Sequence, residues 1–211
     1  MTNIGQFRFK TAEIGIFNTA AVRPVTDSIR ADNRVIGLTN GEFSLIDLIA
    51  GCLQKTGPAH VVVATWSAGI KDAHQCRWLL DSDRIQTFRL ITDHSYATRQ
   101  KKYALSITDL FGTENIRTCE SHSKFVLIHN DEWHLSIRTS MNLNANRTCE
   151  NFEIENTGEV FDLFWNWCQH HFDDMPAGFC GSTWRASKAL GKFFQRGGTY
   201  TEQPYKNWSD L

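Results

Sequence analysis

Runs of β-branched residues alternate with stretches of helical periodicity in the first half of the chain, and this alternation restricts the possible folds more than any other feature. One such run is HVVVATW (60–66), which is typical of a strand buried on both faces. Apolar residues then recur at helical spacing from Ile70 to Leu80, and IQTFRLIT (85–92) predicts a second strand. Strands separated by helices of this length form parallel crossovers. The sequence therefore predicts an α/β fold.

The pattern continues on both sides of this pair. VIGLTN (35–40) predicts a strand, and helical periodicity follows from Phe43 to Leu53 and again from Tyr96 to Phe111. Four short strands with short connections come next, which favours a run of antiparallel pairings. These strands are ENIRTC (114–119), SKFVLI (123–128), WHLSIR (133–138) and ENFEI (150–154). An aromatic helix from Val160 to Phe172 closes the pattern. We expect an α-β-α sandwich with a mixed parallel and antiparallel central sheet flanked by helices.

Length and composition place these elements in one main domain. A chain of 211 residues with 41% apolar content can bury a substantial core. We expect this domain over residues 35–175, with an N-terminal segment over 1–34 whose structure the pattern leaves open. A C-terminal extension over 176–211 should pack on or beside the domain.

Cysteine usage and hydropathy indicate the compartment. The six cysteines form no CxxC pair and the N-terminus has no apolar leader, so we expect free thiols in the cytoplasm. No apolar stretch approaches the roughly 20 residues that cross a bilayer, and we expect no membrane contact.

The charge balance restricts the partners. Lys and Arg total 22 against 23 Asp and Glu, so any surface for nucleic acid must be local. One basic stretch near the C-terminus is either a solvated helix face or a track for a nucleic-acid backbone. Its residues are Arg185, Lys188, Lys192 and Arg196.

Two polar pairs flank a predicted hairpin between residues 122 and 142. His122 and Lys124 begin its first strand, and Ser140 and Asn142 stand at the end of its second. Side chains two apart in an extended chain project from the same face, and a turn near 129–132 returns the second pair to the first. An imidazole, an ammonium, a hydroxyl and a carboxamide together suit a phosphoryl group, whose oxygens accept hydrogen bonds. Glu150 opens the next strand, where its carboxylate could fix the tautomer of His122.

These residues resemble the signature of the phospholipase D superfamily, which is His-x-Lys, a downstream Gly-Ser-x-Asn and often a later Glu. The matching residues are His122 and Lys124, then Ser140 and Asn142, then Glu150. The resemblance extends over about residues 35–172 and implies a phospholipase D-like fold. In size the chain resembles the single-motif endonucleases and the phospholipase D-like proteins of phages and prophages.

The sequence departs from that signature at two positions. Position 129, where the family often has Asp, holds His129, and Asp131 follows two residues later. The Gly that usually precedes the Ser is Thr139, which carries a Cβ and a hydroxyl where close backbone approach is expected.

The resemblance implies a mechanism without metal or cofactor. His122 attacks phosphorus to form a phosphohistidine that water hydrolyses, while Lys124, Ser140 and Asn142 hold the phosphoryl oxygens. The family's scheme needs a second His as general acid, and His94 lacks the Lys that would complete a second motif. We therefore expect a homodimer with the active site on its two-fold axis.

The remaining polar residues of this region are candidates for substrate binding. The group consists of Thr139, His134, Asn144 and Arg147. Asn144, Asn146 and Arg147 also suit a turn-shaping role, and His129 and His134 a hairpin surface. We assign no metal to Cys168, His170 and His171, because no partner cluster accompanies them.

The sequence therefore predicts a metal-independent phosphodiesterase, a nuclease that cleaves DNA or RNA. Two alternatives stay open: a phospholipase or small phosphodiester hydrolase, and a catalytically weak dimeric nucleic-acid-binding module. Fold alone does not choose among them.

Overall fold

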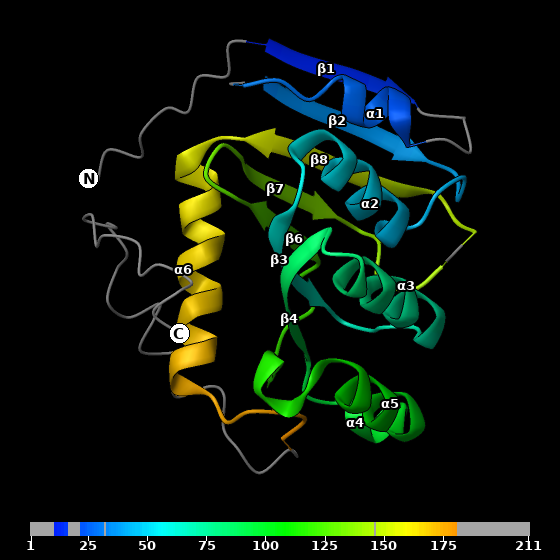
Figure 1. The fold of residues 1–211 in the computed structure, drawn as a ribbon. Helices are drawn as coiled ribbons and strands as arrows, with labels where there is room; N and C mark the ends of the chain where they lie inside the picture. The colour runs from blue at the N-terminus through cyan, green and yellow to red at the C-terminus, as the bar shows by residue number, and fades with distance from the viewer. Residues whose placement is uncertain (1–10, 17–21, 32, 146, 181–211) are drawn as a thin grey trace, which may run out of the picture.

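The computed structural model describes residues 11–16, 22–31, 33–145 and 147–180, which form one eight-stranded sheet between helices (Figure 1). The strand order is β1-β2-β8-β7-β6-β3-β4-β5. In chain order the strands are β1 Thr11–Ile16, β2 Asn33–Thr39, β3 Ala59–Thr65, β4 Ile85–Asp93, β5 Ile116–Cys119, β6 Phe125–His129, β7 His134–Thr139 and β8 Glu150–Asn156.

Helices cover both faces of this sheet. In Figure 1, α2 (Leu45–Thr56), α3 (Ile70–Asp81) and α5 (Lys101–Phe111) lie on one side and α6 (Gly158–Asp174) lies on the other. Short helices complete the set: α1 (Arg23–Asp27), α4 (Tyr96–Arg99) and the 3-10 turn η1 (Thr113–Asn115). The α-β-α sandwich predicted from the sequence is confirmed.

The central strand β3 has the burial that its composition predicts. Every residue from Val61 to Thr65 is buried, because helices pack against both of its faces. The helix that follows each parallel strand begins close to the predicted position. The helical pattern from Tyr96 to Phe111 divides into α4 and α5 at Gln100.

The predicted run of four antiparallel strands is wrong for its first member. Strand β5 pairs in parallel with β4 at the edge of the sheet, and the antiparallel set is β3, β6, β7, β8 and β2. Helices α4 and α5 form a crossover between β4 and β5, and a crossover of that length returns the chain in the same direction.

The connection from β5 to β6 is short for the distance that it covers. Strands β4 and β3 lie between β5 and β6 in the sheet. At the usual strand spacing this is about 14 Å, and six steps from Cys119 to Phe125 span at most about 20 Å, so the five residues 120–124 have little excess length as they cross the ends of two strands. His122 and Lys124 thus lie in this connection, just before β6, and not within the strand.

The N-terminal residues that the structure describes join the sheet. Strand β1 pairs in parallel with β2, with Ile14 opposite Ile36, and α1 packs against α2. No helix in the described part of the chain combines the length and apolar character needed to cross a bilayer.

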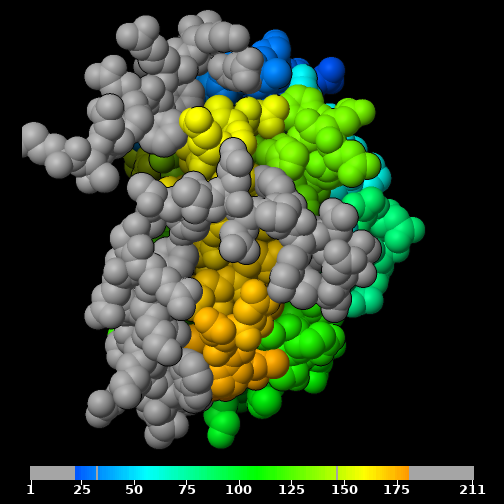
Figure 2. All heavy atoms as spheres, turned by 90° about the vertical axis from the view of Figure 1, so that its left-hand side faces the viewer, coloured from blue at the N-terminus to red at the C-terminus, as the bar shows by residue number. Residues whose placement is uncertain are grey.

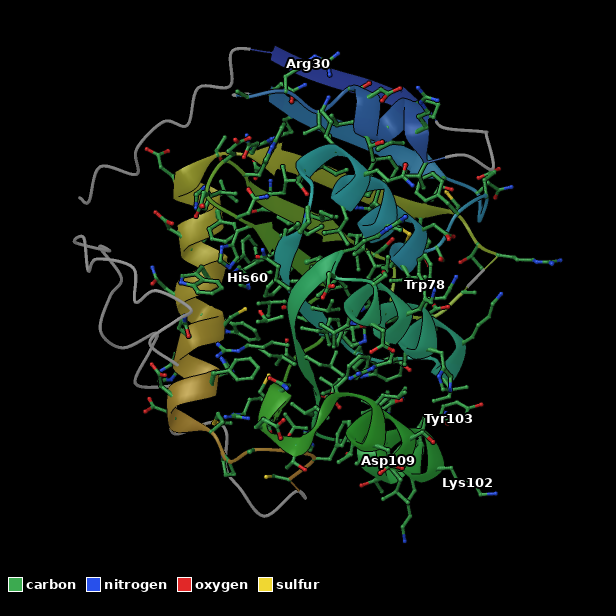
Figure 3. All side chains as sticks on the ribbon, in the orientation of Figure 1. Arg30, His60, Trp78, Lys102, Tyr103 and Asp109 are labelled. Carbon is green, nitrogen blue, oxygen red and sulfur yellow. The ribbon has the colours of Figure 1, made fainter. Side chains whose placement is uncertain are left out.

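The face under α6 is rich in aromatic rings and histidines. Figure 2 shows α6 running along this face, and Figure 3 shows His60 on the same side of the sheet. His129 packs against Trp165, with ring centroids 4.9 Å apart, and against His60 at 5.0 Å. Burial and the neighbouring His60 and His134 lower the pKa of His129 to about 3, so this imidazole is neutral. Position 129 is therefore a core position.

A buried carboxylate joins three strands on the face of the sheet that also carries His129 and α6. Glu155 of β8 has no exposed side-chain surface and binds Arg34 of β2 at 3.1 Å and Arg138 of β7 at 2.7 Å. Glu153 pairs with the same two arginines but keeps 22% of its side chain exposed. The two carboxylates balance two guanidinium groups, so the network is neutral.

We predict that Glu155→Gln lowers the free energy of unfolding by about 2–3 kcal/mol, less than a fully buried pair would lose, because both arginines are partly solvated. Urea denaturation measures this change. Glu153→Gln is the matched control and should cost about 1 kcal/mol or less. Equal losses in the two variants would contradict the role of burial at Glu155.

Candidate active site

The carboxyl ends of the parallel strands meet the ends of the antiparallel strands at one edge of the sheet. This edge is the border formed by the strand ends, and it is distinct from the outermost strands. Thr65 ends β3 and Asp93 ends β4, while β6 begins at Phe125, opposite Ala64. Thr139 ends β7 opposite Phe152, close to the start of β8. Ligands of open α/β sheets bind at this edge, because loops there leave the strands in different directions.

His122 and Lys124 lie together above the ends of β3 and β4. The ammonium Nζ of Lys124 is 3.2 Å from Nδ1 of His122 and donates to the His122 carbonyl at 3.0 Å. His122 is exposed, and its Nε2 has no hydrogen-bond partner among the described residues. Partial burial lowers the pKa of Lys124, opposed by the negative charge of Glu150. The pairing predicted from the spacing is present.

Ser140 and Glu150 form the second part of the site. The Ser140 hydroxyl donates to Oε2 of Glu150 and accepts from the amide of Asn151 at 3.0 Å. The other carboxylate oxygen of Glu150 accepts from the Thr148 hydroxyl at 3.3 Å. The hydrogen bond predicted between His122 and Glu150 stays a prediction, whereas the charge of Glu150 does act on Lys124.

Thr139 uses its hydroxyl to hold the turn that carries Ser140. It donates to the carbonyl of Asn151 at 2.6 Å and accepts from the amide of Met141 at 3.0 Å. Among the described residues, Asp83 is the one non-glycine residue with positive φ, so the backbone at Thr139 does not require glycine. The departure from the usual Gly is compatible with the local conformation.

Asn142 is positioned by a residue from the central strand. The hydroxyl of Thr65 lies 3.3 Å from Oδ1 of Asn142, donates to the Ser67 carbonyl and accepts from the amide of Leu143. Ala68 and Leu143 also form a parallel bridge. Thr65 is buried, with 2% of its surface exposed. Its hydrogen bond to Leu143 and the Ala68–Leu143 bridge hold the segment after β7 at the end of β3.

Of the three other predicted binding residues, two lie at the same edge of the sheet and one does not. Arg147 lines a cavity of about 230 Å³ on the same edge, formed by the β2–α2 loop, the start of α3 and the β7–β8 connection. Asn144 packs against Gly69 beside it. His134 lies at the opposite end of the β6–β7 hairpin, paired with His129, and the structure does not bring it to His122. His134 directly follows the turn of the hairpin, so the length of β6 and β7 separates it from His122.

Two neighbours of His122 escaped the sequence analysis. The indole ring of Trp66 lies 5.1 Å from the His122 ring, and the guanidinium carbon of Arg99 lies 3.8 Å from the Trp66 ring. Trp66 directly follows the buried strand β3, a position that points to the ligand-binding edge of a parallel sheet. Arg99 follows β4 in α4 and carries no such signal.

Comparisons with known proteins bear on the fold. No protein-family model matches the chain, and no curated protein matches it. The chain is similar to the crystal structure of a phospholipase D family member, Nuc from Salmonella typhimurium. The sequence identity is 12%, the TM-score is 0.52, and the match covers 68% of this chain and 96% of that one. At this identity the similarity shows the fold, and the predicted phospholipase D-like architecture is confirmed.

Two further solved structures resemble the chain. NucT from Helicobacter pylori has 15% identity and a TM-score of 0.49, over 68% of this chain and 99% of that one. The phosphatidylserine synthase of Haemophilus influenzae Rd KW20 has 14% identity and a TM-score of 0.48, over 78% of this chain and 45% of that one. We base the fold assignment on the similarity to Nuc.

We predict that Thr139→Val lowers the free energy of unfolding by about 1 kcal/mol, because the Asn151 carbonyl and the Met141 amide each lose a partner. Thr148→Val, which removes an exposed hydroxyl, should change it by less than about 0.5 kcal/mol. Urea denaturation compares the two. A Thr139→Val variant as stable as the parent would mean that the Thr139 hydroxyl does not hold the turn.

Proposed function

We propose that the chain is a phosphodiesterase of the phospholipase D superfamily and acts as a nuclease that cleaves DNA or RNA without a metal ion. The observation that supports this proposal is the link between two contacting pairs, His122 with Lys124 and Ser140 with Glu150: the Thr139 amide donates to the Lys124 carbonyl at 3.2 Å, and the negative charge of Glu150 acts on Lys124. The chemistry of these groups fits a phosphoryl centre, which needs a nucleophile and donors for its oxygens. The exposed His122 gives the nucleophile access to substrate.

The proposed reaction has two displacements. A ring nitrogen of His122 attacks phosphorus, a P–N bond forms, and the P–O bond to the leaving oxygen breaks as a second imidazolium protonates that oxygen. Water then attacks phosphorus, the P–N bond breaks, and the water proton passes to the second imidazole. Lys124, Ser140 and Asn142 offset the charge that builds on the phosphoryl oxygens.

The contact between Lys124 and His122 bears on how the nucleophile is prepared. A charged ammonium has no acceptor, so in this contact Nδ1 accepts and the ring proton lies on Nε2. Nε2 attacks only when it carries no proton. A phosphoryl oxygen that draws Lys124 away leaves Nδ1 able to hold the proton, and Glu150 is the carboxylate that would accept its hydrogen bond. Substrate binding would then itself produce the reactive tautomer.

The second imidazole is proposed to come from the symmetry mate in a homodimer. A two-fold axis through the site would place two copies of His122 on opposite sides of phosphorus. Within the chain, His94 is the histidine at the same edge, with its amide bound to the Cys119 carbonyl at 2.9 Å and its ring 3.5 Å from the Asp93 carboxylate. The two sources of the second imidazole predict different behaviour in mixed dimers.

We predict that the purified protein cleaves plasmid, single-stranded DNA or RNA in EDTA and that His122→Ala lowers the rate by at least about a thousand-fold, as removal of a covalent nucleophile does. His134→Ala is the control, because its ring lies at the other end of the hairpin, and should keep the parental rate. Acid-labile radiolabel on the protein would report the phosphohistidine.

Three outcomes of this assay would count against the proposal. Equal activity in parent and His122→Ala rejects the assigned nucleophile. Loss of cleavage in EDTA, restored by a divalent ion, rejects the metal-independent scheme. Hydrolysis of phosphatidylcholine without cleavage of nucleic acid moves the activity to phospholipids.

We predict that mixtures of parent and His122→Ala subunits lose activity with the square of the parent fraction, because a shared site needs His122 from both chains. The mixtures are unfolded and refolded together so that subunits redistribute, and sedimentation checks the dimer. A linear loss would show that each chain acts alone, and His94→Ala would then test the intrachain source. Mixing the parent with His134→Ala controls for refolding losses.

The basic stretch over Arg185, Lys188, Lys192 and Arg196 and the loop residue Asn146 lie outside the described residues.

A further inference from the structure

Trp66 and Arg99 form a constellation beside His122 that the proposed chemistry does not use. The imidazole of His122 lies 5.1 Å from the indole ring, and the Arg99 guanidinium stacks at 3.8 Å on the same indole. These two separations place the guanidinium carbon within about 9 Å of the imidazole. A fixed positive charge thus lies next to the proposed nucleophile.

Arg99 is held in place although it is exposed. Its Nε donates to the Ser95 hydroxyl at 2.9 Å, and Nη2 donates to the carbonyl of Trp66 at 3.2 Å. Ser95 is itself bound by Asp93, whose carboxylate accepts from both the amide and the hydroxyl of Ser95. An exposed arginine usually samples many rotamers, but stacking and these bonds restrict this one.

The guanidinium keeps a donor for a ligand. Nη1 of Arg99 has no hydrogen-bond partner among the described residues. Its two N–H groups suit a phosphate, which pairs with guanidinium better than with a mobile ammonium. Because one face of the indole already carries Arg99 and the ring also contacts His122, Trp66 serves as a support and leaves little room for a stacked base.

Positive charge continues from Arg99 along the chain. Lys101 and Lys102 open α5 and are exposed, and Figure 3 shows Lys102 directed away from the helical layer. The whole chain carries a formal charge of -1, so this local cluster stands out. Three exposed cations within residues 99–102, the first of them stacked on the indole that contacts His122, fit a polyanion better than a single phosphodiester.

We propose that Arg99, supported by Trp66, binds the phosphate next to the scissile one on a nucleic-acid strand, with Lys101 and Lys102 extending this contact. This subsite rests on the proposed nuclease function and adds to it a second contact on the polymer, with a phosphate that flanks the cleaved bond. The upper bound of about 9 Å between the His122 ring and the Arg99 guanidinium lets the two side chains contact neighbouring phosphates of one strand. The subsite would favour oligonucleotides over isolated diesters.

The test compares two substrates in three variants. Arg99→Gln should lower kcat/KM for a single-stranded oligonucleotide by roughly ten-fold or more, because a charge-assisted hydrogen bond to phosphate is lost. Its rate on bis(p-nitrophenyl) phosphate, which has one phosphate, should stay within about two-fold of the parent. For Arg99→Lys we expect a kcat/KM for the oligonucleotide between those of the parent and of Arg99→Gln. Lysine keeps the charge but loses the planar pair of donors that a guanidinium offers to a phosphate.

Arg84→Gln is the matched control. Arg84 is also exposed and lies over an indole, that of Trp78 on α3, at 5.3 Å, but it precedes β4 at the opposite end of that strand. Figure 3 labels Trp78 in the helical layer. This variant should match the parent on both substrates.

Salt dependence gives a readout that does not require turnover. In the His122→Ala background, fluorescence anisotropy measures oligonucleotide binding between low and high salt. Adding Arg99→Gln should reduce the slope of log affinity against log salt by about one, the value for one phosphate contact. Adding Arg84→Gln should leave the slope unchanged.

The outcomes separate the subsite from the function on which it rests. If the parent cleaves the oligonucleotide but Arg99→Gln behaves as Arg84→Gln does, the subsite is rejected and the nuclease proposal stands. If the parent hydrolyses neither substrate, the proposed function fails and the subsite with it. If Arg99→Gln slows only the hydrolysis of phosphatidylcholine vesicles, Arg99 serves a lipid surface and the nucleic-acid assignment is rejected.

Discussion

The short connection between β5 and β6 is the constraint on which the rest of the site depends. Five residues leave one edge strand, cross the ends of β4 and β3, and enter β6 on the far side. A connection this short stays close to the strand ends that it crosses. His122 and Lys124 are therefore fixed above the carboxyl ends of the parallel strands, where neither packs into the core. The proposed nucleophile owes its exposure to this path.

The antiparallel strands then supply the partners of His122 and Lys124. Because β6 enters beside β3 and β7 returns along it, Ser140 arrives at the same edge, and β8 begins there with Glu150. Thr65 fastens the following segment to the central strand. The site thus joins groups from a parallel and an antiparallel half, and the buried Glu155 network joins β2 and β7 to β8. The residues of the Glu155 network are therefore different from the residues that line the proposed site.

Particular residues show how far sequence reasoning reached. The strand, helix and hairpin patterns predicted the elements closely, since burial on one or both faces imposes a local period. The pairing of His122 with Lys124 followed from a separation of two residues. In contrast, β5 was expected in an antiparallel run and lies parallel to β4, and His134 was grouped with the site but lies at the other end of its hairpin. Both errors concern which strands become neighbours and which end of a ladder a residue occupies.

Taken by itself, the sequence determined the kinds of element, their order, and a set of polar side chains suited to a phosphoryl group, because these depend on local periodicity and on side-chain chemistry. Only the tertiary structure decided the strand order, the path of residues 120–124 and the placement of Trp66 and Arg99 beside His122. Those features depend on pairing between residues far apart in the chain, which a local pattern does not encode. Arg99 is the plainest case: in the sequence it is one charged residue of a short helix, and in the fold it lies against the ring that supports His122.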